Sequence, residues 1–352
     1  MSRIPQRTNP LTQAEDRIRT LVQQRAGQRL PSERELAAEL VISRPRLRSI
    51  LDTLEAQGLI ERKPGSGTYA VALEREPLSR VAVLIDDHLK LRDDPFISLL
   101  FESLQNTLQE EGARCTIERV GADDTSYRLE DGAITLGLVG HRIIEELRPA
   151  DPPVVGLLLG PDARPRRRAS IFLIDDREAG ANAARFLIER GCEKIFFVGR
   201  KDIPASNERL EGVTAAVAGT GVEMTFIASH LNYAAGLKLG LEWTPPTHDG
   251  PVGIIVTNDW LAVGLRTGFR RHDVRVTDPP LYLVSFDGLA IAADPALDIR
   301  TLAIPIEAIA RDAVMELRNL SRTPVSVGRL VRYPLSWLKE PTAEPEHTLV
   351  AV

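Results

Sequence analysis

The sequence predicts an α/β protein in two parts, a small N-terminal helical module and a larger body built on parallel sheets. Residues 29–71 indicate the first part, because they read as two amphipathic helices separated by a short turn and followed by a glycine-tipped hairpin. The second part is indicated from residue 80 onward, where near-continuous apolar runs alternate with helical stretches. Such runs are typical of parallel strands that helices cover on both faces.

Length and composition are those of a globular protein. The chain has 352 residues, of which 43% are hydrophobic and 26% charged, so it is too long for one small core. No apolar stretch is long enough to span a membrane, and residues 1–10 lack the apolar core of a signal peptide, so we expect a cytoplasmic protein without a membrane partner. Cys115 and Cys192 are far apart in the sequence and are expected to be buried free thiols rather than a disulfide or metal ligands.

Charge is distributed unevenly along the chain. Residues 1–75 contain 13 Lys and Arg against 9 Asp and Glu, a net charge of +4. The remaining residues contain 31 Lys and Arg against 40 Asp and Glu, a net charge of −9. A basic end joined to an acidic body is typical of a protein that contacts nucleic acid at one end only.

The first helix is predicted from Ser32 to about Leu40. Ser32 can cap its start, and Glu35, three residues later, completes a capping box. The apolar residues that follow recur at helical spacing, so one face of this helix is expected to be buried.

The second helix is predicted from Ser43, which can cap it, to about Leu54. Arg44, Arg46 and Arg48 fall in its first turns, the part of a helix-turn-helix that meets base edges and phosphates. Arginine suits both contacts because its guanidinium is a planar fork of donors. The pattern therefore indicates a DNA-binding module. The alternative, a small helical core whose arginines are merely solvated, is disfavoured because cap, spacing, arginine placement and hairpin all agree.

A hairpin with a glycine-rich tip is predicted after the second helix. Residues 59–62 form its first strand and residues 68–71 its second. Glycines at the tip let the protein backbone approach the phosphate backbone of DNA or enter its minor groove.

The segments PSERELAAEL, SRPRLRSILDTLEAQGLI and GSGTY resemble the winged-helix domain of the GntR family of bacterial regulators, from about Leu11 to Val71. The resemblance implies a winged helix-turn-helix domain over residues 1–73 that binds double-stranded operator DNA. Pro45 stands where the family usually has a small hydroxyl residue, so the base preference there is expected to be unusual. The implied DNA-binding residues are Arg34, Ser43, Arg44, Pro45, Arg46, Arg48, Lys63, Gly65, Ser66, Gly67 and Thr68.

The body is expected to follow a short polar linker, residues 74–80, and to extend over residues 81–340, with residues 341–352 as a mobile tail. Its apolar runs are bounded by glycine and polar residues, and helical stretches separate them. The predicted strands are 81–87, 115–120, 133–140, 154–160, 171–175, 194–200, 223–229, 253–259 and 281–287.

Carboxylates and amides stand where several predicted strands end. Ligands of parallel sheets bind at the carboxyl ends of the strands, so these side chains are expected to gather in a crevice and to accept hydrogen bonds from hydroxyl groups. Taken singly, each can also be a loop or helix-cap residue. The residues are Asp86, Asp87, Asp175, Asp176, Asn258, Asp259 and Asp287.

The order of these elements resembles the effector domain of the LacI family, itself similar to periplasmic sugar-binding proteins. Among the matching segments are IDDREAGANAARFLIERGCEKIFFVG and VTNDWLAVGLRTGFRRHDVRV, and the resemblance covers about Arg80 to Pro341. It implies two α/β subdomains with crossing strands, a ligand cleft between them and a homodimer. Trp260 is interpreted either as a ring that stacks on a sugar or as a core residue. The implied ligand-binding residues are Asp94, Phe96, Asp175, Arg209, Asn258, Asp259, Trp260 and Asp287.

Some features depart from that family and leave the identity of the ligand open. Cys192 and Glu193 stand where a histidine and a basic residue are usual, and the segment HLKLRDDPF is longer and more charged than in most members. The basic run RPRRR at residues 164–168 is expected to be a solvated surface, with a phosphate contact as the alternative.

A GntR-type head on a LacI-type body resembles the architecture of arabinose-responsive repressors. The sequence therefore predicts a repressor that binds operator DNA as a dimer and is released by a small sugar-like effector. The alternatives are a non-sugar ligand, a corepressor that strengthens DNA binding, and an enzyme with an accessory DNA-binding head. A transport-type solute-binding protein is disfavoured by the DNA-binding head. No nucleophile elbow, phosphate loop or paired-histidine motif is present in the sequence, so no catalytic residue, metal or cofactor is expected.

Overall fold

The chain forms two compact units, residues 1–77 with 321–326 and residues 78–320 with 327–352. The division between Pro77 and Leu78 falls inside the predicted linker, most of which lies outside the described residues, as does the predicted tail at 341–352. The structure is a computed structural model, and it describes residues 14, 17–18, 21–22, 25, 27–56, 59–63, 65–70, 78–91, 93–148, 150–245, 249–271, 280–322 and 327–338.

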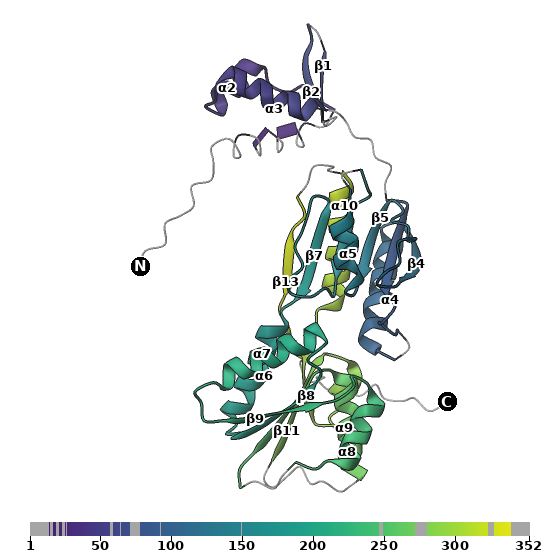
Figure 1. Cartoon of the computed structure of the whole chain (residues 1–352), viewed down its shortest axis with the longest axis vertical. Coiled ribbons are helices and arrows are strands. Elements are labelled where there is room, and N and C mark those ends of the chain that lie inside the picture. The colour runs from purple at the N-terminus through teal and green to yellow at the C-terminus, as the bar shows by residue number, and fades with distance from the viewer. Residues whose placement is uncertain are drawn as a thin grey trace, which may run out of the picture. The chain divides into compact units, whose positions relative to one another are not determined.

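The first unit contains a helix-turn-helix and a two-stranded hairpin (Figure 1). The predicted capping box is present, because the Ser32 side chain accepts the Glu35 N–H while the Glu35 carboxylate accepts the Ser32 N–H. The apolar faces of both helices pack into one core, as their spacing predicted. The elements are α2 (Glu33–Glu39), α3 (Arg44–Ala56), β1 (Ile60–Lys63) and β2 (Gly67–Ala70).

Val41, in the turn between α2 and α3, has a positive φ of 54° and is 89% exposed. The left-handed conformation costs a residue with a Cβ about 1–2 kcal/mol, and no burial offsets that cost here. We expect Val41→Gly to raise the free energy of unfolding of this unit by about 1 kcal/mol. Amide hydrogen exchange of α3 measures the change. Val41→Ala keeps a Cβ at the same φ and should gain less, and lower protection in the glycine variant would contradict the expectation.

The body contains two six-stranded sheets with helices packed against them (Figure 1). The first sheet has the strand order β13-β7-β6-β5-β3-β4 and is parallel throughout. The second has the order β14-β12-β11-β10-β8-β9 and is parallel except for the edge strand β14. The predicted α/β fold with two parallel-sheet subdomains is confirmed.

Each half of the body contains elements from distant parts of the chain. The first half contains β3 (Arg80–Asp86), α4 (Pro95–Glu110), β4 (Arg114–Val120), β5 (Gly132–Leu136), α5 (Val139–Glu146), β6 (Val154–Leu157), β7 (Ala169–Ile174), α10 (Ile306–Arg322) and β13 (Leu330–Tyr333). The second half contains α6 (Asp176–Glu189), β8 (Lys194–Gly199), α7 (Pro204–Val217), β9 (Glu223–Ala228), α8 (Tyr233–Glu242), β10 (Val252–Val256), α9 (Asp259–Arg271), β11 (Leu281–Asp287), the 3-10 helix η1 (Ala290–Ala293), β12 (Ile299–Ala303) and β14 (Ser336–Trp337).

Among the described strands, the chain passes between the two sheets three times, after β7, β12 and β13. The predicted strands are present, but the apolar run 133–140 is divided. β5 ends at Leu136 because Gly137 takes a positive φ of 95°, and α5 begins at Val139. The short strands β12, β13 and β14 were not predicted.

Helices α6 and α7 pack with their backbones in direct contact. A Cβ placed on Gly180 of α6 would lie 2.0 Å from the Arg209 carbonyl oxygen of α7. A Cβ placed on Gly212 of α7 would lie 1.9 Å from the Arg177 carbonyl oxygen. This approach, which only glycine permits, places the Arg209 side chain beside the start of α6.

Two expectations about the surface need correction. Arg168 of the basic run is 1% exposed and not solvated, because the tight turn that pairs Arg166 with Ala169 directs Arg168 inward while Arg167 stays exposed. Cys192 is buried as expected, but Cys115 is only half-buried. None of the described helices is long and apolar enough to cross a membrane.

Candidate functional site

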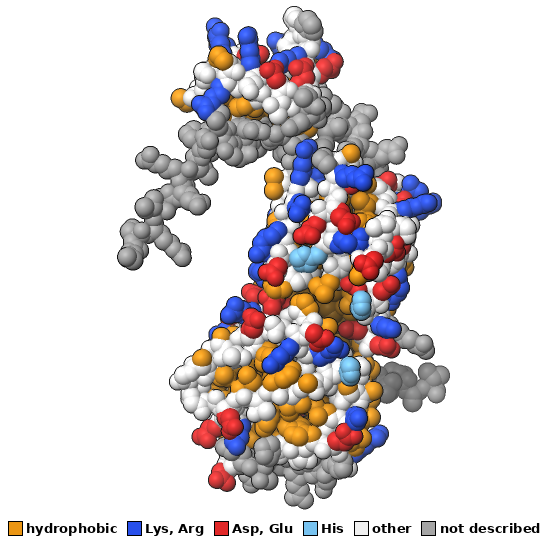
Figure 2. Space-filling view, viewed as in Figure 1, with side chains coloured by type: hydrophobic (Ala, Val, Ile, Leu, Met, Phe, Trp, Pro, Cys, Tyr) orange, Lys and Arg blue, Asp and Glu red, His pale blue; other side chains and the backbone are white. Residues whose placement is uncertain are grey.

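The predicted arginines lie on the exposed side of the helix-turn-helix. Arg44, Arg46 and Arg48 are exposed on the first turns of α3, and Arg34 is exposed on α2. Basic side chains stand out from this unit in Figure 2. Exposed cations on one helix can meet phosphates and base edges of a duplex together.

The start of α3 is fixed by its backbone. The Ser43 carbonyl oxygen accepts the Leu47 N–H at 2.9 Å, which is the first helical hydrogen bond. Pro45 is exposed within the first turn, where its missing N–H leaves no hydrogen bond unmade. Arg62 of β1 is held against α3 by Asp52 at 2.6 Å and Glu55 at 3.6 Å, so it orients the hairpin on the helix.

The hairpin has the tight tip that was predicted. Strands β1 and β2 pair from Ile60–Ala70 to Lys63–Gly67, and Gly65 and Gly67 have positive φ of 73° and 117°. The Lys63 Nζ lies 5.2 Å from the centre of the Tyr69 ring. Ser66 and Thr68 lie on the same tip, and the Ser66 and Tyr69 hydroxyls are 2.7 Å apart.

Arg29 is a basic residue of the hairpin that sequence reasoning missed. Its backbone forms a bridge with Tyr69, and a Cβ on Gly67 would lie 2.7 Å from the Arg29 Nε. The glycine at position 67 therefore makes room for the Arg29 side chain, a second cation beside the tip after Lys63. In the sequence, Arg29 is one of several arginines before the first predicted helix. Nothing in the local pattern distinguishes it from a solvated arginine.

In the body, the Arg209 guanidinium lies at the centre of a buried cluster. Arg209 is 4% exposed; its Nε and Nη2 each lie 2.7 Å from the Asp176 Oδ1. Its Nη1 donates to the Thr257 carbonyl oxygen and lies 3.8 Å from the Asp287 Oδ1. The guanidinium carbon lies 4.6 Å from the centre of the Phe286 ring. Helix α6, the residue after β10 and the end of β11 thus converge on one cation carried by α7.

Asp94 brings the first half of the body to this cluster. It caps α4 by accepting the Phe96 N–H at 3.1 Å and the Ile97 N–H at 3.4 Å. Burial raises the pKa of Asp94, and the nearby Arg209 charge partly opposes that rise. In Figure 2, hydrophobic side chains gather between the two halves of the body, with charged side chains around them.

Carboxylates outnumber the cation in the cluster. Burial raises the pKa of Asp176 and raises that of Asp287 well above its usual range, while Arg209 lowers both. One guanidinium is therefore shared by several carboxylates whose remaining oxygens can accept hydrogen bonds. The arrangement suits a ligand rich in hydroxyl donors, which would bind by charge-assisted hydrogen bonds.

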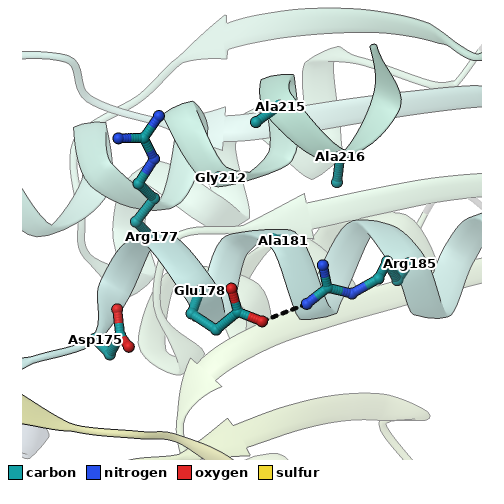
Figure 3. Close-up of a pocket in the computed structure, with 8 residues that line it drawn as sticks. All are labelled: Asp175, Arg177, Glu178, Ala181, Arg185, Gly212, Ala215 and Ala216. Carbon is teal, nitrogen blue, oxygen red and sulfur yellow. Dashed lines mark hydrogen bonds and ion pairs between the residues drawn. The ribbon is translucent and has the colours of Figure 1, made fainter. Parts of the chain in front are cut away.

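The structure places Asp176, and not Asp175, beside Arg209. Helix α6 begins at Asp176, and Asp175 occupies its N-cap position without a side-chain hydrogen bond to the helix. Neighbouring residues at the strand–helix junction point to different sides, so adjacent aspartates have different surroundings. Asp175 lines a separate pocket of about 360 Å³ (Figure 3), together with Arg177, Glu178, Ala181, Arg185, Gly212, Ala215 and Ala216.

The other predicted ligand residues make contacts within the protein. Asn258 caps α9 by accepting the Leu261 N–H at 3.0 Å. Asp259 is fully buried and accepts the Ser285 hydroxyl and, at 2.7 Å, the Leu289 N–H; burial raises its pKa to about 6. These contacts position the ends of β10 and β11 around the cluster.

The two aromatic side chains that were predicted to contact the ligand pack against other residues of the protein. Trp260 is half-buried, with its ring centre 5.2 Å from that of Tyr233, and Phe96 is 7% exposed in the core. Of the predicted residues, the structure therefore places Arg209 and Asp287 in contact, with Asp94 near enough for its charge to interact with theirs.

Two known protein families match separate parts of the chain. Residues 10–70 match the family described as bacterial regulatory proteins, gntR family, and residues 184–337 match the periplasmic binding protein-like domain. The chain joins a GntR-family domain to a periplasmic-binding-protein-like domain. The chain is thus similar to transcription regulators in its N-terminal domain and to periplasmic binding proteins in its body.

Several known proteins are similar to most of the chain. The arabinose metabolism transcriptional repressor of Halalkalibacterium halodurans is 24% identical over 301 residues, 79% of each chain. A LacI family regulator from Enterococcus faecium, solved with bound ribose, has a TM-score of 0.62 at 18% identity and covers 74% of this chain and 97% of its own. The lac repressor dimer bound to operator and the anti-inducer ONPF has a TM-score of 0.62 at 15% identity and covers 76% of this chain and 94% of its own. The solved structures support the fold of the periplasmic-binding-protein-like domain.

Proposed function

We propose that the protein is a repressor that binds operator DNA as a homodimer in the cytoplasm and is released by a small sugar-like effector. One observation carries the proposal: the chain that exposes arginines on α3 also buries a guanidinium–carboxylate cluster to which both halves of the body contribute. The relatives named for arabinose metabolism and for bound ribose support a sugar as the effector. The dimeric relative on its operator supports two DNA-binding domains per assembly.

The cluster can act as a switch by linkage. An effector that binds between Asp94 of one half and Arg209 of the other favours the arrangement in which the two halves approach it most closely. If DNA also prefers one of the two arrangements, the effector changes DNA affinity by the same factor as DNA changes effector affinity, a coupling of typically about 1–3 kcal/mol. Binding alone produces this response, so the effector should be recovered chemically unchanged.

Replacing the recognition arginines tests the DNA-binding half of the proposal. We expect Arg44→Ala and Arg46→Ala each to weaken binding to a duplex selected in vitro by the full-length protein by about 10-fold or more, the effect of losing one good base contact. Where the lost contact is to a phosphate, the slope of log K against log salt should fall by about 1. Fluorescence anisotropy over a salt series measures both quantities.

The matched control is Arg114→Ala, which removes an exposed arginine of β4 in the body and should leave both quantities unchanged. Unchanged affinity and slope in the α3 variants would exclude this helix as the DNA contact. A thermal-shift screen of pentoses, hexoses, uronates and sugar phosphates tests the effector, because a ligand that binds the folded body raises its melting temperature.

A further inference from the structure

An ion pair joins the recognition helix to the helix before it. The Arg48 Nε of α3 lies 2.9 Å from the Glu33 Oε2 of α2, with exposed side-chain fractions of 66% and 31%. Among the described residues, Arg48 is the one of the three arginines on the first turns of α3 that the structure joins to a carboxylate. An exposed ion pair of this kind contributes little to stability. Its main effect is therefore on the contacts that the Arg48 side chain can make with DNA.

Glu33 is well placed to hold that guanidinium. It is the first residue of α2, where the positive end of the helix dipole favours a carboxylate. The capping box between Ser32 and Glu35 fixes this end of the helix around it. The carboxylate is therefore anchored on one helix while it bonds a side chain of the next.

The atom of Arg48 that Glu33 contacts determines which nitrogens of the guanidinium can contact DNA. Glu33 engages the Nε of Arg48, and within the described part of the chain no contact involves its two terminal nitrogens, so both are available to DNA. Two terminal nitrogens in one plane match the O6 and N7 acceptors of guanine in the major groove. The same carboxylate repels phosphates, which opposes the sequence-independent part of DNA binding.

We propose that Glu33 is a positioning residue that determines specificity: it orients Arg48 for end-on recognition of a base and weakens binding to unrelated DNA. The proposal rests on the proposed DNA-binding function. It predicts opposite effects of one substitution on two kinds of duplex, which a merely structural role for Glu33 would not produce.

The test measures Kd of the full-length protein for a duplex selected in vitro by the wild type and for a random-sequence duplex of equal length. Glu33→Gln is expected to tighten binding to the random duplex about threefold, because a repelling charge is lost. It should weaken binding to the selected duplex about 10-fold, because a neutral amide oxygen holds the Arg48 guanidinium less firmly than the carboxylate does. The ratio of the two Kd values should therefore fall by about 30-fold.

Two further variants separate the effect of the charge at position 33 from the effect of the side-chain length. Glu33→Asp keeps the charge on a shorter side chain, so the random duplex should bind as in the wild type while the selected duplex binds more weakly. Glu33→Gln combined with Arg48→Gln should discriminate no less than Arg48→Gln alone, since both changes act through one pair.

The matched control is Glu39→Gln, the same chemical change at an exposed position of the same helix, for which the described residues show no ion pair. It should change the ratio by less than about twofold. An unchanged ratio in Glu33→Gln, with Arg44→Ala still impaired, overturns the inference and leaves the proposed function intact. Unchanged DNA binding in all the α2 and α3 variants overturns both.

Discussion

Arg209→Met is expected to lower the free energy of unfolding of the body by about 3–5 kcal/mol, the cost of leaving buried carboxylates without their cation. The residue is 4% exposed and contacts Asp176 at 2.7 Å, so solvent screens the pair little. Methionine keeps much of the apolar volume of the arginine side chain. The loss of stability therefore measures mainly the effect of removing the positive charge. Urea unfolding followed by tryptophan fluorescence measures it, because Trp243, Trp260 and Trp337 all lie in the body.

The double variant Arg209→Met with Asp176→Asn provides the control. Removing the carboxylate that the substitution leaves unpaired should recover part of the lost stability. Both variants should also lose the thermal response to any effector that stabilises the wild type. A stability loss under about 1 kcal/mol in the single variant would mean that the cluster is not an ion-paired core.

Gly180→Ala is expected to cost about 3 kcal/mol although it adds a single methyl group. That methyl would lie 2.0 Å from the Arg209 carbonyl oxygen, and backbone cannot rotate away as a side chain can. Helix α7 must therefore move, and Arg209 moves with it. The same urea unfolding experiment measures the loss, and a weaker effector response in the thermal-shift assay should accompany it.

Glu189→Ala, at the exposed end of α6, is the comparison for this substitution. It introduces the same residue into the same helix without a close backbone neighbour, so its effect should stay within about 0.5 kcal/mol. If the two variants were equally stable, the close approach of α6 and α7 would be wrong.

The elements that the sequence predicted are those whose signals are local. Ser32 and Glu35 define a helix start by their spacing alone, and the capping box is present. Buried parallel strands such as β3 and β11 appear as apolar runs because both of their faces are covered. Strand order and the short strands β12, β13 and β14 depend on distant pairing, which no local pattern records.

The site was predicted less completely because adjacent residues can point to opposite surroundings. Asp175 and Asp176 are chemically identical, and only the exact start of α6 decides which one meets Arg209. The Glu33–Arg48 pair joins positions 15 residues apart, so it needed the packing of α2 on α3 to be seen. Arg168 was misjudged for the same reason, since charge alone does not reveal a loop that turns inward.

The three passages of the chain between the sheets have a consequence for biosynthesis. Strands β13 and β14, at residues 330–337, each complete the edge of a different sheet. Neither half of the body can therefore finish folding before residues 330–337 are synthesised, whereas the N-terminal helices and hairpin are complete some 260 residues earlier. A nascent chain that stalls before residue 330 would carry an assembled DNA-binding head on an unfinished, chaperone-dependent body.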